Sequence, residues 1–427
     1  MKIGFVVHFF DFRNDVRMLI KEVAKKHDVV LYVNKNHFLD VKNHNIEGTS
    51  VKLIDEKINS KRNKILHILY YFFKNLPASR NNFFLMESFK IEKTQNKIKK
   101  KYASIILKTI MVLPKLIKYD WYLNKLSYSK KTDLNDIDQM IFFTEISNDY
   151  LLARCIYEQI KTSVYVYSWD HPFKQTKFSN KINYKTWSQS TKNDLVDLQK
   201  IDPNNIQILG SSQFGYIYDF QKNYNNSRTF KFKYIYYACA IGIDTLVKEE
   251  IKLIKKLNSI INKHASNLKL VVRPYPVLND WSLYEILKNE GIIFDDNFRT
   301  TDLSVKNSNI QEKFEKIKNA ELVLHIGTTF GLEASFFKTP SVIIDFGHNK
   351  FSKKKLSIKN FIHQGQNDKY LINICSNNVF SEEVDLYNWL DNYQNFGNKK
   401  NNLFNSKITS NFIIKSFSQI SDEITHN

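Results

Sequence analysis

The sequence predicts an α/β protein of two doubly wound domains that face each other across a cleft, with a helical insertion in the first. Three observations predict it. At 427 residues the chain is too long for a single ordinary core. Apolar runs alternate with charged helical segments along both halves, as in parallel sheets covered by helices on both faces. This alternation stops at a lysine-rich helical stretch (55–135) and again at a polar stretch (219–230).

The polar stretch DFQKNYNNSRTF (219–230) has no periodicity, so we place the domain boundary there. We expect an N-terminal Rossmann-like domain at 1–220 and a C-terminal one at 229–405. The last segment, 406–427, contains an amphipathic helix that can pack back on the first domain.

In the first half, apolar runs predict buried strands and the periodic segments between them predict helices. The strands are expected at 2–9, 28–33, 139–144, 163–169 and 205–212. The segments between them are expected at 14–26, 147–159 and 189–199.

The insertion interrupts this order with two helical segments, KILHILYYFFKNL (64–76) and 87–118. The second pairs a basic stretch with an apolar one. Two interpretations stay open: a helical insertion packed on its own domain, or a basic amphipathic surface that rests on anionic lipid headgroups.

The second half repeats the alternation. Its strands are expected at 233–241, 268–274, 291–296, 322–326 and 341–346. Its helices are expected at 244–264, 279–290 and 310–321, with a short one between the last two strands.

Lysine and arginine exceed aspartate and glutamate by 63 to 43, a net charge of +20. Such an excess favours polyanionic partners: phosphorylated ligands, nucleic acid or an anionic membrane surface. Abundant Lys, Asn and Ile with scarce Gly and Pro are equally consistent with compositional drift.

Three cysteines (Cys155, Cys239 and Cys375) lie far apart, which argues against a disulfide framework and a structural zinc site and fits a reducing cytoplasm. No long apolar run precedes Asp11, so we expect a first strand and not a signal peptide. The most apolar segment, 103–117, is broken by two lysines and a proline and is too short to span a bilayer.

The stretch HIGTTFGLEASFFKTPSVIIDFG (325–347) places a glycine and two threonines where a strand gives way to a helix. Gly327 lets the backbone approach a ligand closely, and Thr328 or Thr329 can cap the helix. The unpaired N–H groups of the first turn, with the helix dipole, suit a phosphate or diphosphate. Glu333, one turn on, can accept hydrogen bonds from ribose hydroxyls. An ordinary capped helix fits the same pattern.

A second candidate, VVRPYP (271–276), also follows a strand of the second domain. Arg273 can fork onto phosphate oxygens, and two prolines hold the loop that carries it. Taken alone, it is a loop with a solvated arginine. Because two strand ends of one domain suit anions, we expect them to form one donor site.

Taken in order, RPYP (273–276) and NAELVLHIGTTFGLEASFFKTPSVIIDF (319–346) resemble the C-terminal domain of bacterial GT-B glycosyltransferases that build surface polysaccharides such as capsule and lipopolysaccharide. YSWDHPFKQ (167–175) and YKTWSQSTKNDLVDLQKIDPNNIQILGSSQFGYIYD (184–219) are similar to a first-domain passage of the same enzymes. NDVRMLIKEVAKKHDVVLYV (14–33) resembles their opening. The resemblance covers most of the chain outside the insertion and implies a GT-B fold of two Rossmann-like domains.

The resemblance also implies how the donor is held. In those enzymes a loop like that of Arg273, Tyr275 and Pro276 and a turn like 327–333 hold the donor nucleotide. Tyr275 departs from the pattern, since related loops have histidine there. No D-x-D motif stands in a context suited to a metal-held diphosphate, which favours a metal-independent transfer with no cofactor besides the nucleotide-sugar.

The base of an inverting transfer would come from loops after strands of the first domain. Asp170 and His171 are the first choice, because histidine titrates near pH 7 and a neighbouring carboxylate can orient it. Asp15 is the second. Both choices also have a purely structural interpretation. Asp170 and His171 can serve to fix their loop, and Asp15 can be a first-turn aspartate that the helix dipole favours.

The sequence therefore predicts a glycosyltransferase that moves a sugar from a nucleotide-sugar to a surface glycan or lipid-linked acceptor, in the cytoplasm or on the inner face of the membrane. A UDP-sugar 2-epimerase has the same architecture and remains an alternative. A non-enzymatic nucleic-acid-binding or scaffolding protein is the third, although the lysines are spread along the chain and no nucleic-acid-binding motif is present.

Overall fold

The structure is a computed structural model of the chain. It describes residues 1–7, 14–76, 87–88, 90–91, 94, 96–143, 148–168, 172, 176–224, 228–240, 244–275, 282–296, 307–346, 379–396 and 412–426.

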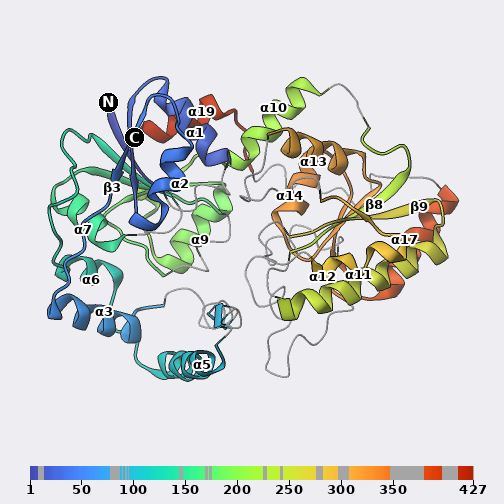
Figure 1. The fold of residues 1–427 in the computed structure, drawn as a ribbon, viewed down its shortest axis with the longest axis horizontal. Helices are drawn as coiled ribbons and strands as arrows, with labels where there is room; N and C mark the ends of the chain where they lie inside the picture. Colours follow the sequence, from blue (N-terminus) through green and yellow to red (C-terminus); the bar gives the residue numbers. More distant parts are fainter. Residues whose placement is uncertain are drawn as a thin grey trace. The chain divides into compact units, whose positions relative to one another are not determined.

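The chain divides into two compact units, each built on its own parallel sheet (Figure 1). The first unit combines Met1–Tyr218 with Asn411–Asn427, and the second is Asp219–Ser410. In each sheet the strand order runs outward in both directions from the unit's first strand, as in a Rossmann fold. The predicted α/β class with two Rossmann-like units, the GT-B type, is therefore confirmed.

The sheet of the first unit has the order β3-β2-β1-β4-β5-β6-β7, and every neighbouring pair is parallel. Its strands are β1 (Lys2–Val7), β2 (Asp28–Val33), β3 (Thr49–Leu53), β4 (Gln139–Phe143), β5 (Lys161–Tyr165), β6 (Asn183–Thr186) and β7 (Ile206–Ile208). Its helices are α1 (Asn14–Ala24), α2 (Phe38–Asn43), α3 (Lys61–Phe73), α5 (Lys97–Val112), α6 (Tyr119–Lys125), α7 (Asp149–Tyr157), α9 (Gln189–Gln199) and α19 (Phe417–Thr425).

Two hydrophobic cores cover the two faces of this sheet, because alternate side chains of the fully apolar strands point to opposite faces. On one face Phe5 and Leu19 belong to a core shared by α1 and α19. On the other, Phe142 and Leu151 belong to a core that includes α3, α6, α7 and α9.

The chain returns to its first unit through α19. Ser416 begins this helix with a capping box, in which its side chain and that of Gln419 each accept a hydrogen bond from the other residue's N–H group. Phe417, Ile420 and Ile424 are buried in the core that contains α1. Residues near the C-terminus therefore complete one face of the first sheet.

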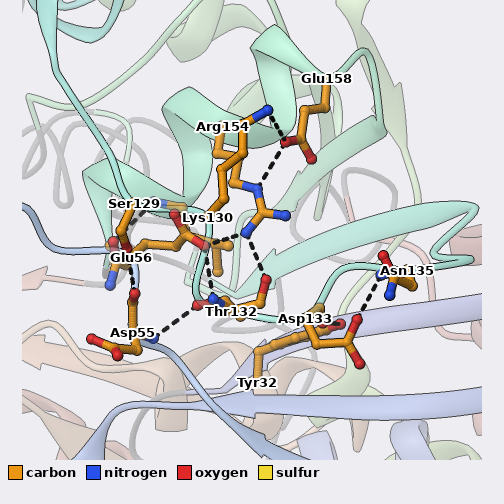
Figure 2. Close-up of polar contacts among 12 residues, drawn as sticks. Tyr32, Asp55, Glu56, Ser129, Lys130, Thr132, Asp133, Asn135, Arg154 and Glu158 are labelled. Atoms are coloured by element: carbon orange, nitrogen blue, oxygen red, sulfur yellow. Dashed lines mark hydrogen bonds and ion pairs between the residues drawn. The ribbon is translucent and has the colours of Figure 1, made fainter.

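A buried ion-pair network fastens the insertion to α7 (Figure 2). The Arg154 guanidinium pairs with Glu56, donates to the Thr132 carbonyl oxygen at 2.6 Å, and binds Glu158 at 3.0 Å. A carboxylate oxygen of Glu56 also accepts from the Thr132 N–H at 3.2 Å. Since Glu56 lies near the start of the 55–135 stretch and Thr132 near its end, one arginine ties both ends to α7.

The sheet of the second unit has the order β10-β9-β8-β11-β12-β13, again parallel throughout. Its strands are β8 (Lys233–Ala238), β9 (Leu268–Arg273), β10 (Ile293–Phe294), β11 (Leu322–His325), β12 (Ser341–Ile344) and β13 (Val379–Phe380). Its helices are α11 (Asp244–His264), α12 (Ser282–Glu285), α13 (Asn307–Asn319), α14 (Thr329–Phe336) and α17 (Glu383–Phe396), and α10 (Gly215–Asn223) leads into it from the first unit.

Some elements differ from those that periodicity predicts. α10 continues into the expected linker because Phe220 is buried, with its ring 5.7 Å from that of Phe314 and 5.3 Å from that of Phe337. The helix expected at 279–290 is, within the described residues, the single turn of α12 and a 3-10 turn at Lys288–Glu290. The strands β3, β6 and β13 were not predicted, because they are short or polar and only pairing with a neighbouring strand stabilises them.

Candidate functional site

The strand order of the second unit reverses between β8 and β11, so the loops after these two strands diverge. In open parallel sheets, ligands bind at this point, outside the carboxyl ends of the strands. The loop after β11 is the Gly327–Thr328 turn that leads into α14, and β9 and β10, on the other side of β8, end at Arg273 and just before Asp295. The candidate site of the second unit is built from these ends and from α13.

The turn after β11 has the geometry that the sequence predicts, but its N–H groups are not unpaired. Gly327 has φ +83°, a conformation that favours glycine. Thr328 caps α14, its hydroxyl oxygen accepting from the Phe330 N–H at 3.3 Å. The N–H groups of Gly327 and Thr328 both donate to His325 Nδ1, at 3.1 and 3.2 Å. The expectation that the Thr328 amide is free to bind an anion therefore needs correction.

His325 holds this turn in place. Its side chain is buried, and burial lowers its pKa from 6.5 to about 4, so the ring is neutral at pH 7. Because Nδ1 accepts two hydrogen bonds, the proton of the neutral ring belongs on Nε2. The ring lies directly against Gly331, where an added Cβ would be 2.6 Å from Cε1 and closer still to Nε2. Gly331 therefore makes room for His325.

Arg273, at the end of β9, is paired within the protein. Its Nη1 lies 2.5 Å from Oδ2 of Asp295, a residue that is 2% exposed. The Tyr236 hydroxyl donates to the same carboxylate, and Lys316 Nζ binds its other oxygen at 2.6 Å. Burial disfavours the charge of Asp295, but Arg273 and Lys316 outweigh it and lower its pKa. The sequence predicts a solvated or ligand-binding arginine, whereas the structure gives it a buried carboxylate partner.

Glu333 is also paired. Its Oε1 lies 2.7 Å from Nζ of Lys313 on α13, and both side chains are largely buried. Burial lowers the pKa of Lys313, and Glu333 opposes that shift. Lys313 also lies over the rings of Phe314 and Phe330, at 4.7 and 5.9 Å from the centroids. Where the sequence suggests a ribose acceptor, the structure shows a carboxylate that holds a buried lysine.

The side chains of this cluster balance in charge. Arg273, Lys313 and Lys316 carry three positive charges, and Asp295, Glu333 and Glu312, which binds Lys316 at 2.6 Å, carry three negative ones. A phosphate that enters has to share cations already paired. Lysine has three N–H donors and arginine has five, so both can bridge a protein carboxylate and a ligand.

The remaining predicted donor residues are only partly placed. Tyr275 lies in the loop after β9 and is half-buried. Pro276 lies outside the described residues. Thr329 is the first residue of α14.

In the first unit, Asp15 is buried near the start of α1 and holds two hydroxyl groups. Tyr167 donates to its Oδ1 at 3.0 Å and Ser212 to its Oδ2 at 2.5 Å. These partners follow β5 and β7, so Asp15 joins the carboxyl ends of three strands. Asp170 and His171 lie outside the described residues, and their expected role stays a prediction.

Sequence reasoning missed several members of the site, among them His325, Gly331, Asp295, Lys313 and Lys316. Two signals were available. Asp295 lies near the end of the expected strand 291–296, at the same edge of the sheet as Arg273, and a histidine immediately precedes the Ile-Gly-Thr-Thr turn. The two lysines gave no such signal, because the second half of α13 carries three lysines and the sequence does not distinguish among them. Among the described residues, no group of three or more His, Cys, Asp or Glu side chains is arranged to hold a metal ion.

No protein-family model matches the chain, and no curated protein matches it in sequence. Similarity appears at the level of the fold. A structure from Listeria monocytogenes, provisionally assigned as a UDP-N-acetylglucosamine 2-epimerase, aligns with a TM-score of 0.50 and 10% identity over 99% of this chain and 94% of that one. The UDP-GlcNAc 2-epimerase of Methanocaldococcus jannaschii aligns with a TM-score of 0.50 and 14% identity over 100% of both chains. At such identities the similarity shows a shared two-unit fold.

Proposed function

We propose that this protein is an enzyme that acts on a nucleotide-sugar, and that its reaction is the 2-epimerisation of a UDP-sugar. The main support is the end-to-end similarity of its fold to two structures described as UDP-GlcNAc 2-epimerases. The polar cluster where the strand order of the second unit reverses is the second support, because nucleotides bind at such points in related folds.

In this proposal the diphosphate of the UDP-sugar lies at the start of α14. Lys313 and Arg273 supply positive charge there, each shared between a protein carboxylate and the phosphate. His325 keeps the turn rigid, so the backbone is preorganised when the ligand arrives. Because the cluster is already neutral, the ligand gains less from it than from unpaired cations, and we expect moderate affinity.

Epimerisation at C2 breaks the C–H bond by removal of a proton to a base on one face, and a proton that exchanges with solvent is delivered to the opposite face to form the new C–H bond; a base close to that carbon is therefore required. Asp170 and His171 remain the first candidates for this role. Asp15 is a weaker one than the sequence suggests, because both its carboxylate oxygens accept from buried hydroxyl groups. Its contacts suit the positioning of the loops after β5 and β7.

The reaction can be tested without an acceptor. The purified protein is incubated with UDP-GlcNAc alone in deuterated buffer and the sugar is followed by proton NMR. Epimerisation predicts a second UDP-sugar with the opposite configuration at C2 and deuterium at that carbon. If no UDP-sugar shows either deuterium exchange at C2 or a new epimer, epimerisation is excluded.

Glycosyl transfer is the second candidate, favoured by the motifs 273–276 and 319–346, which resemble those of polysaccharide transferases. It predicts that the donor stays unchanged alone and that UDP is released only with a glycan or lipid-linked acceptor. Running the same incubation with and without acceptor separates the two reactions.

Binding at the proposed site is tested by thermal shift with UDP, GDP, CMP, CDP and dTDP. A nucleotide at 100 times its dissociation constant stabilises by about 2.7 kcal/mol, and we expect UDP to do so. Lys313→Met should reduce this stabilisation, whereas Lys318→Met, on the same helix and over the Tyr224 ring, should not. Equal stabilisation of both variants would place the nucleotide elsewhere.

A further inference from the structure

Helix α5 of the insertion has apolar side chains on two opposite faces. The inner face carries Leu107 and Ile110, which pack with Leu76 in a small core of their own. The outer face carries a second apolar row that no described residue covers. Its members are Ile98 (69% exposed), Tyr102 (63%), Ile105 (51%) and Val112 (83%).

These four residues form one stripe along the helix. Their spacings of four, three and seven residues keep them within a narrow sector, since a helix has 3.6 residues per turn. Exposed Ile65, Ile68 and Leu69 form a similar row on α3, which contacts α5. Figure 1 shows α5 beside α3, on the far side of α3 from the first unit's sheet. An exposed apolar row of this kind marks an interaction site.

Charge shows which partner this surface fits. Lys97, Lys101 and Lys108 are exposed and lie along one side of the outer stripe. The sixteen residues of α5 include five lysines and no acidic residue. A second copy of the chain would bring the same lysines against these, and a nucleic acid would leave the apolar stripe uncovered. An anionic lipid surface satisfies both, with headgroups at the lysines and acyl chains over the stripe.

We propose that α5 lies flat on an anionic lipid bilayer, with Ile98, Tyr102, Ile105 and Val112 inserted at the headgroup boundary. At 1.5 Å per residue its sixteen residues form a rod about 24 Å long. None of the described helices is long and apolar enough to cross a bilayer. This inference is independent of the proposed reaction, since lipid binding needs neither a nucleotide nor turnover.

The test is flotation of the full chain with vesicles of phosphatidylcholine alone or with an equal share of phosphatidylglycerol, at 0.15 M salt. We expect binding only to the anionic vesicles. Ile98→Glu should weaken it about tenfold or more, because a charge replaces a buried side chain. Leu39→Glu on α2 is the matched control, since Leu39 is also 69% exposed, and it should bind as the wild type does.

A second variant set tests the charges. Replacing Lys97, Lys101 and Lys108 by glutamine should weaken binding by about 100-fold, at about fivefold per lysine. Replacing Lys131, Lys252 and Lys288, which are exposed elsewhere, should weaken it far less. Unchanged thermal midpoints would show that the variants fold.

Three results would overturn the proposal. The first is no binding of the wild type to anionic vesicles. The second is an equal loss in the stripe variants and their controls. The third is a dimer by sedimentation that Ile98→Glu makes monomeric while vesicle binding persists, because the stripe would then be an interface between two copies.

Discussion

Replacing Gly331 with alanine tests the turn that the proposed site depends on. The new Cβ would lie 2.6 Å from Cε1 of His325 and closer still to Nε2, whereas ordinary contacts begin at about 3.4 Å, so the ring has to move by more than about 0.8 Å. That movement breaks or weakens the hydrogen bonds from Gly327 and Thr328 to Nδ1, each worth about 0.5–1.5 kcal/mol. Overpacking adds about 1–3 kcal/mol, and the better helix propensity of alanine returns up to about 1 kcal/mol. The expected net loss is about 1–6 kcal/mol.

The assay is urea unfolding followed by circular dichroism. The free energy of unfolding is taken from the transition whose urea midpoint differs between the wild type and the variant. His325→Ala supplies the control, because without the ring the new methyl group meets no obstacle. In that background Gly331→Ala should cost nothing or stabilise slightly, so the two changes are strongly non-additive. The reasoning fails if Gly331→Ala costs the same with and without the His325 ring.

Three further outcomes follow from buried ionisable groups. The folded state lowers the pKa of His325 from 6.5 to about 4, so its contribution to the free energy of unfolding, about 3 kcal/mol, is full above pH 6.5 and is lost as the pH falls towards 4. The pH dependence of unfolding in His325→Asn should lack this component. Asp295→Asn removes the buried carboxylate that Arg273 and Lys316 share and should cost about 3–5 kcal/mol in unfolding experiments, while Asp296→Asn, its half-exposed neighbour, should cost little. Arg154→Ala should cost about as much and expose the insertion to limited proteolysis, whereas the exposed Arg62→Ala should do neither.

The parts of the fold that could be predicted from the sequence are those with local causes. The apolar run of β1 and the amphipathic α11 were found at nearly the bounds that the structure has. The same holds for the strand, turn and helix around Gly327, because a glycine and a capping threonine specify their own conformation. Short polar strands such as β6 have no such local signal, since only pairing with a neighbouring strand makes them strands.

The sequence predicts where in the fold the candidate site lies, but not which side chains form ion pairs within it. That Arg273 and the Gly327 turn lie at the same edge of one sheet follows from strands that run in parallel. The pairing of Arg273 with Asp295, 22 residues away, could not be predicted in this way, and neither could that of Glu333 with Lys313, 20 residues away. Each pair joins two different elements of the fold.

By itself, then, the amino-acid sequence determined the α/β class, most of the helices and strands, and the two strand ends where charged and capping groups gather. Tertiary structure alone decided which of those groups remain available to a ligand. The physical reason is that periodicity and capping act over a few residues, whereas a buried charge takes whichever partner the sheet order and the helix above it bring within hydrogen-bonding distance.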